Sequence, residues 1–407
     1  MLEKILDLQR NDRRLELISL MIGTTILDNW KFVFFSDSKG ADLPENLMAD
    51  FGTISVMSIS GTSKFNYYDK IQAENLVKKS DSDFRFVTCI NFDTQLISYM
   101  VDLFENKNIE KHRDVYLFLK HVLKYKMDYT CIPYGIENCS KLYNEKTKIG
   151  VWKTLRTFFF FKSMNNLKEF DKFFSSNEPL MINREIEYET QSFVEKTMKP
   201  LGKNLSTKDP RFMQKIIHCL ILQVIIIKNS SKKGIKKKVE LLFDFWFNQI
   251  GIFMYREIAI CYLYLKNDKK VEKFFGKIQK NNENILGTIS GMAWDLFHIR
   301  NLEKPMGSSE NMDADFEMHL LATYDKGLKE ILSSYPIKSI SFYKSETMEL
   351  RTYPFYKYSI EELITEIDLE QFYKKRSQKN RNKIYEKTNF DYVINERENV
   401  LKKLFEK

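Results

Sequence analysis

The stretch that decides the fold is FRFVTCINFDTQLISYMVDLF, residues 84–104. Its first part, 84–92, is short, almost entirely apolar and rich in aromatic and β-branched residues, which is typical of a strand buried on both faces. Asp93 follows that strand, and the apolar residues of 94–104 then recur at helical spacing. The stretch therefore predicts a buried strand that leads through an acidic turn into a helix.

The same alternation returns farther along the chain. A helix predicted over 114–125 is followed by a short apolar stretch at 129–132. An apolar strand over 319–324 ends on a second acid, Asp325. A fourth candidate, 337–343, alternates between polar and apolar residues, so we expect a neighbouring or an edge strand there. Strands that alternate with helices imply an α/β fold with a parallel sheet and right-handed crossovers.

The composition favours a helix-rich, folded protein. The chain has 407 residues, enough for two or three domains, and 64 basic against 55 acidic residues give a formal net charge of +9. A hydrophobic content of 43% rules out an unfolded polyelectrolyte. Only 14 Gly and 8 Pro are present, so tight turns should be few and an all-β sandwich is not expected.

By composition, we expect the α/β core to lie in two pieces, 81–140 and 285–345. Between them, residues 141–284 are rich in Lys, Phe, Ile and Asn and show helical patterns throughout, which predicts a large all-helical insertion. Residues 1–80 form an N-terminal extension in this division, and residues 346–407 form a basic helical C-terminal tail.

Several common chemistries find no support in the sequence. The cysteines are odd in number and lack CxxC pairing, so neither a disulfide framework nor a cysteine zinc site is predicted. The five histidines lack HxxxH and HExxH spacing, and no P-loop, Rossmann or nucleophile-elbow motif occurs. The longest apolar run, 216–227, is too short to span a bilayer and predicts a buried helix. Since the N-terminus also lacks a secretory signal, we expect a cytoplasmic protein without membrane contact.

Acidic residues follow the predicted strands where ligands usually bind. In open parallel sheets, ligands lie beyond the carboxyl ends of the strands. Asp93 and Asp325 each end a strand, so their carboxylates converge if the two strands are neighbours. Glu137 follows the 129–132 strand by one helical turn.

A fourth acid, Asp295, lies in a predicted helix over 285–303. It comes three residues after Met292 and four before Ile299, which places a carboxylate on the apolar face. A buried acid is costly unless it is paired or metal-bound. Acids that converge repel one another, and a divalent cation removes that conflict; oxygen ligands suit Mg²⁺ or Mn²⁺. Other acids remain as alternative ligands, namely Asp313, Asp315 and Glu257.

Four segments resemble a known family in their order and in their strand and helix context. They are INFDTQLISYMVDLF (90–104), IPYGIEN (132–138), MAWDLFHIRNLE (292–303) and HLLATYDKGLKEI (319–331). Together they resemble the acidic motifs of PIN-like nuclease domains. The resemblance implies a PIN-like core whose acids bind divalent metal and cleave RNA, or DNA flaps in some branches. The matching metal ligands and catalytic residues are Asp93, Glu137, Asp295 and Asp325, with Thr94 and Thr323 as hydrogen-bonding support.

Two basic runs bear on the substrate. KNSSKKGIKKK (228–238) has six lysines and no acid, and KKRSQKNRNK (374–383) has six basic residues. Such runs favour phosphate backbones, although a Lys-rich run is also an ordinary solvated surface. Tyr373 and Tyr385 flank the second run and are candidates for base stacking. In the same tail, SIEEL (359–363) has the cap and acidic first turn of a helix start.

These observations lead to two hypotheses. The first is a metal-dependent endoribonuclease with Mg²⁺ or Mn²⁺ as cofactor, in RNA processing, as a toxin with an inhibitory partner, or in phage defence. The second is a non-catalytic helical protein for nucleic-acid binding or scaffolding, in which the acids cap helices and form ion pairs. The high aromatic content, with 32 Phe and 21 Tyr, also suits a homodimer.

Overall fold

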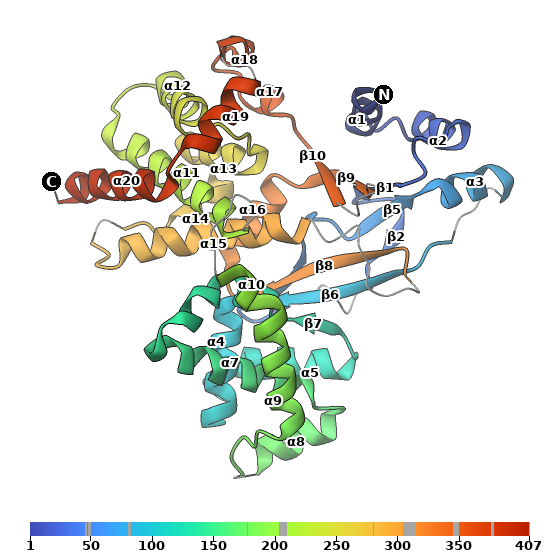
Figure 1. Cartoon of the computed structure of the whole chain (residues 1–407), viewed down its shortest axis with the longest axis vertical. Coiled ribbons are helices and arrows are strands. Elements are labelled where there is room, and N and C mark those ends of the chain that lie inside the picture. The colour runs from blue at the N-terminus through green and yellow to red at the C-terminus, as the bar shows by residue number, and fades with distance from the viewer. Residues whose placement is uncertain are drawn as a thin grey trace. The chain divides into compact units, whose positions relative to one another are not determined.

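The computed structural model has a mixed α/β fold, 62% helix and 15% strand, which confirms the helix-rich α/β expectation (Figure 1). A PIN-like core is not established by this composition of elements. The residues that the structure describes are 1–44, 47, 50–79, 83–176, 178–202, 210–279, 281–303, 314–344, 350–375 and 378–406.

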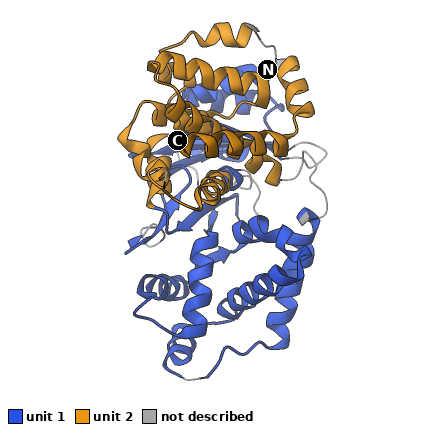
Figure 2. Cartoon of the chain, turned by 90° about the vertical axis from the view of Figure 1, so that its left-hand side faces the viewer, with its two compact units in different colours: residues 1–204, 300–325, 336–355 blue, residues 205–299, 326–335, 356–407 orange. Residues whose placement is uncertain are grey.

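The chain forms two compact units (Figure 2). Unit 1 comprises residues 1–204, 300–325 and 336–355, and unit 2 comprises 205–299, 326–335 and 356–407. The chain thus passes between the units several times. Because compactness does not decide which segment is inserted into which, the domain boundaries proposed from composition stay a prediction.

The first sheet of unit 1, sheet B, contains the strand that decides the fold. Its strands β8, β6 and β7 are parallel, as the sequence predicts. The strands β4 and β3 continue the sheet beyond β8 in antiparallel pairs and come from the expected N-terminal extension. Both parallel and antiparallel pairs are therefore present. The strands, in their order across the sheet, are β3 (Asp50–Phe51), β4 (Ile54–Ser58), β8 (Phe316–Thr323), β6 (Phe86–Phe92) and β7 (Asp128–Thr130).

The second sheet of unit 1, sheet A, is antiparallel in the pairs β1–β5, β1–β9 and β2–β5. The strand expected at 337–343 is β9, which lies between β10 and β1 here, so its placement as a neighbour or edge of the first sheet was wrong. Alternation alone does not specify a partner strand. The strands in order are β10 (Leu350–Tyr356), β9 (Ile337–Lys344), β1 (Trp30–Ser36), β5 (Lys64–Tyr68) and β2 (Ala41–Asp42).

Helices pack on both sheets of unit 1. On sheet B, the ring of Phe92 lies 5.2 Å from Phe118, 5.2 Å from Tyr129 and 5.9 Å from Phe158. Phe158 belongs to α7, so a helix from the segment expected to be an insertion packs directly on β6. The helices are α1 (Leu2–Arg10), α2 (Arg14–Gly23), α3 (Lys70–Lys79), α4 (Thr94–Asn106), α5 (Arg113–Lys124), α6 (Ile132–Asn138), η2 (Cys139–Tyr143), α7 (Glu145–Lys162), α8 (Leu167–Ser175), α9 (Arg184–Phe193), η3 (Val194–Met198) and α10 (Lys199–Gly202).

The described elements of unit 2 are all helical. Apolar residues of 216–227 are buried in α11, which confirms the buried helix. By length and composition Arg211–Ser230 is the one described helix that matches a membrane span, and 67% of it is buried inside the structure. Ser359 caps a helix with an acidic first turn, as predicted, and together with Glu362 it forms a capping box. The helices are α11 (Pro210–Ser230), α12 (Ile235–Phe245), η4 (Trp246–Ile250), α13 (Tyr255–Leu265), η5 (Lys269–Val271), α14 (Glu272–Phe275), α15 (Ile285–Glu303, to residue 299), α16 (Lys326–Ser334), α17 (Ile360–Leu363), α18 (Leu369–Lys375), α19 (Gln378–Lys387) and α20 (Phe390–Phe405).

Candidate functional site at the end of sheet B

The two strands that end on acids are direct neighbours. β6 pairs with β8 in parallel, with Phe92 opposite Ala322, and the backbone N–H of Asp93 donates to the carbonyl of Ala322 over 3.1 Å. Figure 1 shows the two strands side by side. Asp93 and Asp325 therefore lie at the same edge of the sheet, because each follows the carboxyl end of one strand of a parallel pair.

Asp93 has a structural role at this edge. Its side chain is buried, with 8% exposure, and one carboxylate oxygen, Oδ1, accepts a hydrogen bond of 2.6 Å from the backbone N–H of Leu96. Asp93 is thus the N-cap of α4, which is the structural role expected if the acids cap helices. A carboxylate has two oxygens and several lone pairs, so capping does not by itself exclude a second role.

Glu137 reaches the same edge from α6. The hydroxyl of Thr94, the residue after Asp93, donates a 2.5 Å hydrogen bond to Glu137 Oε2. On the β8 side, the hydroxyl of Thr323 accepts a 3.0 Å hydrogen bond from the backbone N–H of Asp325. We call Asp93, Glu137 and Asp325 the acidic edge. Both predicted supporting threonines make hydrogen bonds within it.

The electrostatic influence of the acidic edge extends to Tyr324. Its ring lies 4.7 Å from the ring of Tyr99, centroid to centroid. Burial raises the pKa of the Tyr324 phenol, and the carboxylates of Asp114 and, more weakly, Asp93 add to that shift. The phenol is therefore a neutral hydrogen-bonding group at physiological pH.

The three acids do not form a tight ligand cluster. Among the described residues, one group of three or more His, Cys, Asp or Glu side chains has all its ligand atoms within 4.8 Å of one another, and it does not include Asp93, Glu137 or Asp325. Direct coordination of one ion by all three acids thus does not fit this structure. The oxygen donors do fit a hydrated Mg²⁺ or Mn²⁺, which contacts one or two carboxylates and keeps several waters.

Asp295 belongs to unit 2, whereas the acidic edge belongs to unit 1. Its side chain is 28% exposed, and Lys277 Nζ lies 3.5 Å from its Oδ2. The ion pair supplies the compensation that a carboxylate on an apolar helix face needs. The helical position was predicted correctly, and the lysine partner could not be read from the local pattern.

The alternative acids lie elsewhere. Asp315 Oδ2 accepts a 2.7 Å hydrogen bond from the backbone N–H of Arg85, at the amino ends of β6 and β8 and so opposite to the acidic edge. Glu257 is buried in α13 of unit 2, 1% exposed. Asp313 lies outside the described residues. Asp315 therefore does not replace a ligand of the acidic edge.

The basic runs are surface features in part. Lys232, Lys233, Lys236 and Lys237 are exposed. Lys228 instead donates a 2.8 Å hydrogen bond to the carbonyl of Tyr264 near the end of α13.

The flanking tyrosines of the second run pack within unit 2. The Tyr373 ring packs against Phe253, and its hydroxyl donates to Glu361 over 3.0 Å. Tyr385 packs against Phe212 and Phe390. These contacts bury each ring in part and leave it partly exposed. Base stacking on either tyrosine stays a prediction.

Comparison with known proteins does not assign the chain to a family. No family model, no curated protein and no solved structure matches the chain. The PIN-like resemblance therefore rests on the four sequence motifs alone.

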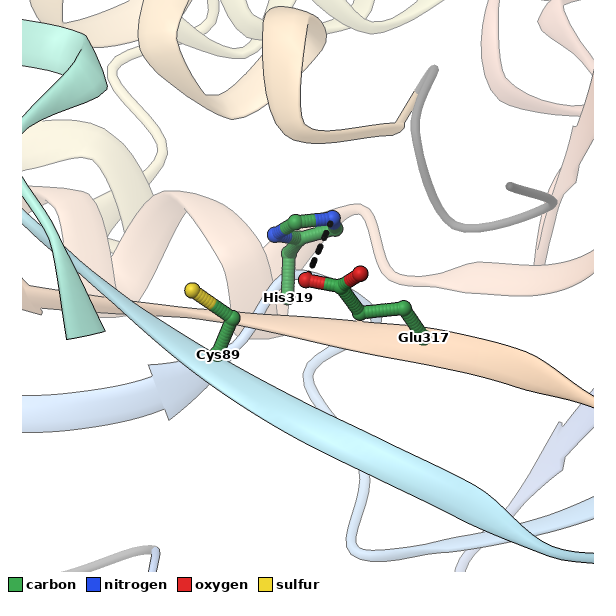
Figure 3. A group of neighbouring side chains, drawn as sticks. All are labelled: Cys89, Glu317 and His319. Carbon is green, nitrogen blue, oxygen red and sulfur yellow. Dashed lines mark ion pairs between the residues drawn. The ribbon is translucent and has the colours of Figure 1, made fainter. Parts of the chain in front are cut away.

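The sequence did not predict a second group of candidate ligands in the same sheet. Cys89 of β6 and Glu317 and His319 of β8 have their ligand atoms within 4.8 Å of one another (Figure 3). The available signal was the i, i+2 spacing of Glu317 and His319 on a strand, which places both on one face. The partner Cys89 depends on strand register, and no local pattern reveals register.

Proposed function

We propose that this chain is a divalent-metal-dependent nuclease that hydrolyses phosphodiester bonds, with RNA as the preferred substrate. The observation that supports the proposal most is the position of Asp93 and Asp325 beyond the carboxyl ends of two paired parallel strands. This is where open α/β sheets bind their ligands. Such an activity suits an RNA-processing factor, a toxin or a phage-defence protein.

Each residue of the acidic edge has a distinct part in this proposal. Asp93 and Asp325 would hold a hydrated Mg²⁺ or Mn²⁺. Thr94 fixes the Glu137 carboxylate through its 2.5 Å hydrogen bond. A divalent cation there would activate water and stabilise the charge that develops on the attacked phosphate. The exposed lysines of the first basic run, such as Lys232 and Lys236, belong to unit 2 and would attract a phosphate backbone to that unit.

The test is cleavage of single-stranded and structured RNA, and of DNA, by the full chain with Mg²⁺, Mn²⁺ or a chelator. The informative variants are Asp93→Asn and Asp325→Asn. Asn is about as good an N-cap as Asp, so Asp93→Asn removes the charge and keeps an acceptor for Leu96. We expect each variant to lose on the order of 100-fold in rate, the size of a charge-stabilising interaction of a few kcal/mol.

The matched control is Asp315→Asn. It makes the same chemical change at the other end of the same strands, and an Asn oxygen can still accept from Arg85. Asp315→Asn should cleave like the wild type. Equal activity in the wild type, Asp93→Asn and Asp325→Asn would contradict the proposal and indicate a contaminating nuclease or another site.

A second candidate, a non-catalytic nucleic-acid-binding or scaffolding protein, is favoured by two observations. Asp93 already serves as a helix cap, and the acidic edge lacks a tight ligand cluster. RNA binding that is salt-dependent and occurs without metal or cleavage would support this candidate.

A further inference from the structure

A second set of potential ligands lies in the middle of β6 and β8. In the parallel register Cys89 is opposite His319. Glu317 precedes His319 by two residues, and side chains two apart on a strand share a face. Register and alternation therefore bring a thiol, an imidazole and a carboxylate together on one face of sheet B, opposite to that of Phe92. We call Cys89, Glu317 and His319 the mid-strand group.

The mid-strand group is compact, and one of its atoms lacks a partner. The ligand atoms all lie within 4.8 Å of one another, and His319 Nε2 is 3.6 Å from Glu317 Oε1, too far for a good hydrogen bond (Figure 3). His319 is only 7% exposed, and its Nε2 has no hydrogen-bond partner. A buried, unsatisfied nitrogen costs stability and is uncommon in folded proteins, so this one calls for an explanation.

The protonation states suit a metal ligand set. Burial lowers the pKa of His319 to about 4, so the imidazole is neutral at physiological pH, the form that binds metals. Burial, with the nearby charges of Glu317 and Asp128, raises the pKa of the Cys89 thiol to about 12, and Lys162 opposes that shift. Without a cation the thiol is therefore protonated. A bound cation would replace its proton.

We propose that Cys89, Glu317 and His319 form a binding site for a divalent transition-metal ion, with zinc as the ion that best matches the donors. Sulfur, nitrogen and carboxylate oxygen are the usual zinc ligands, whereas Mg²⁺ avoids thiolates. Three protein ligands leave a fourth position for water. This site is independent of the proposed nuclease site, which uses oxygen donors alone.

Asn91 contacts the ring nitrogen of His319 that does not face Glu317. Its Nδ2 lies 3.2 Å from His319 Nδ1 and 3.2 Å from the carbonyl of Leu320. Asn91 Nδ2 also lies 3.3 Å from the carbonyl of Cys89. In the tautomer in which Asn91 donates to Nδ1, the ring proton is on Nε2. When the metal binds Nε2, that proton moves to Nδ1, the Asn91 amide turns so that its oxygen accepts it, and the Cys89 thiol releases one proton. One proton is released in total.

The test uses the full chain after removal of metals with a chelator. Zn²⁺ binding is measured by competition with a chromophoric chelator, and Co²⁺ serves as a spectroscopic probe, because thiolate ligation gives it a charge-transfer absorption band that oxygen and nitrogen ligands do not. We expect one equivalent of zinc to bind and the Co²⁺ complex to show the thiolate band. A Co²⁺ complex without that band would overturn the proposal.

Variants assign the ligands. Cys89→Ser should lose the thiolate band, and Glu317→Gln, which keeps the side-chain shape, should weaken zinc binding at least about tenfold. The control is Cys139→Ser, because Cys139 donates to the carbonyl of Ile136 over 3.2 Å and a serine can keep this bond. Thermal unfolding verifies that each variant folds. A band that persists in Cys89→Ser, or an unchanged affinity in Glu317→Gln, would overturn the assignment.

Discussion

The mid-strand group lies within β6 and β8, whereas the acidic edge lies beyond their carboxyl ends, and the two differ in how their side chains are positioned. They are four residues apart along β6, about 13 Å at the rise of an extended chain. The acidic edge begins where β6 and β8 end, so its geometry depends on the starts of α4 and α6. The mid-strand group lies within the paired part of the strands, where register fixes all three backbones. The ligand atoms are therefore close together where the strands are paired, and farther apart beyond the strand ends.

The largest expected effects are loss of metal binding at the mid-strand group and loss of RNA cleavage at the acidic edge, each through its own variant. Cys89→Ser should abolish the Co²⁺ thiolate band and leave Mg²⁺-dependent cleavage of RNA unchanged. Asp93→Asn should reduce cleavage on the order of 100-fold and leave zinc affinity unchanged. The measurements are RNA cleavage rates and chelator competition on the same protein preparations. If either variant changes both activities to the same degree, the two sites are not separate.

The second effect is the pH dependence of zinc binding to the mid-strand group. The thiol of Cys89, with its pKa raised to about 12, is protonated throughout the physiological range and must lose one proton on binding. His319, with its pKa lowered to about 4, adds a second proton only in strong acid. Zinc affinity should therefore rise about tenfold for each unit of increasing pH between 6 and 8. Chelator competition at several pH values measures this slope, and a flat profile would contradict thiol ligation.

A smaller effect concerns the hydrogen bond that joins α4 to Glu137. Thr94→Val removes the donor to the Glu137 carboxylate, and a hydrogen bond to a charged group contributes about 1.5 kcal/mol or somewhat more. The free energy of unfolding should fall by about that amount, and Thr94→Ser, which keeps the hydroxyl, should restore most of it. Denaturant titration compares the three proteins. Equal stability of Val and Ser variants would mean that the bond has no net effect.

The smallest effect isolates the capping role of Asp93. Asp93→Ala removes both the charge and the acceptor for Leu96, whereas Asp93→Asn removes only the charge. Loss of an N-cap costs about 1 kcal/mol, so the Ala variant should be less stable than the Asn variant by that amount. Denaturant titration measures the difference. Equal stability of the Asn and Ala variants, both below the wild type, would show that charge, and not capping, determines stability at this position.

The features that the sequence predicted well are local ones. The apolar run before Asp93, the helical spacing after it and the capping box at Ser359 each depend on residues close in the chain, and all three appear in the structure. The sequence placed Asp93 and Asp325 at one edge only on the condition that their strands are neighbours, and the parallel pairing of β6 with β8 meets that condition.

The features that the sequence did not reveal depend on pairing between distant segments. The strands β3 and β4 are only two and five residues long. They are recognisable as part of sheet B only because β3 pairs with β4 and β4 pairs with β8. The position of β9 in sheet A also depends on pairing between distant segments, and so does the register that places Cys89 opposite His319. A pattern along one strand carries no information about its partner.

The parallel pairing of β6 with β8 also has a consequence for synthesis. Residues 93–315 separate the two strands, so β6 has no β8 to pair with until most of the chain has left the ribosome. Contacts over such a separation form slowly, because a long loop must close before the pairing stabilises it. Neither the acidic edge nor the mid-strand group can be complete before β8 has been synthesised. A nuclease built in this way would remain inactive towards its own messenger RNA until translation is nearly finished.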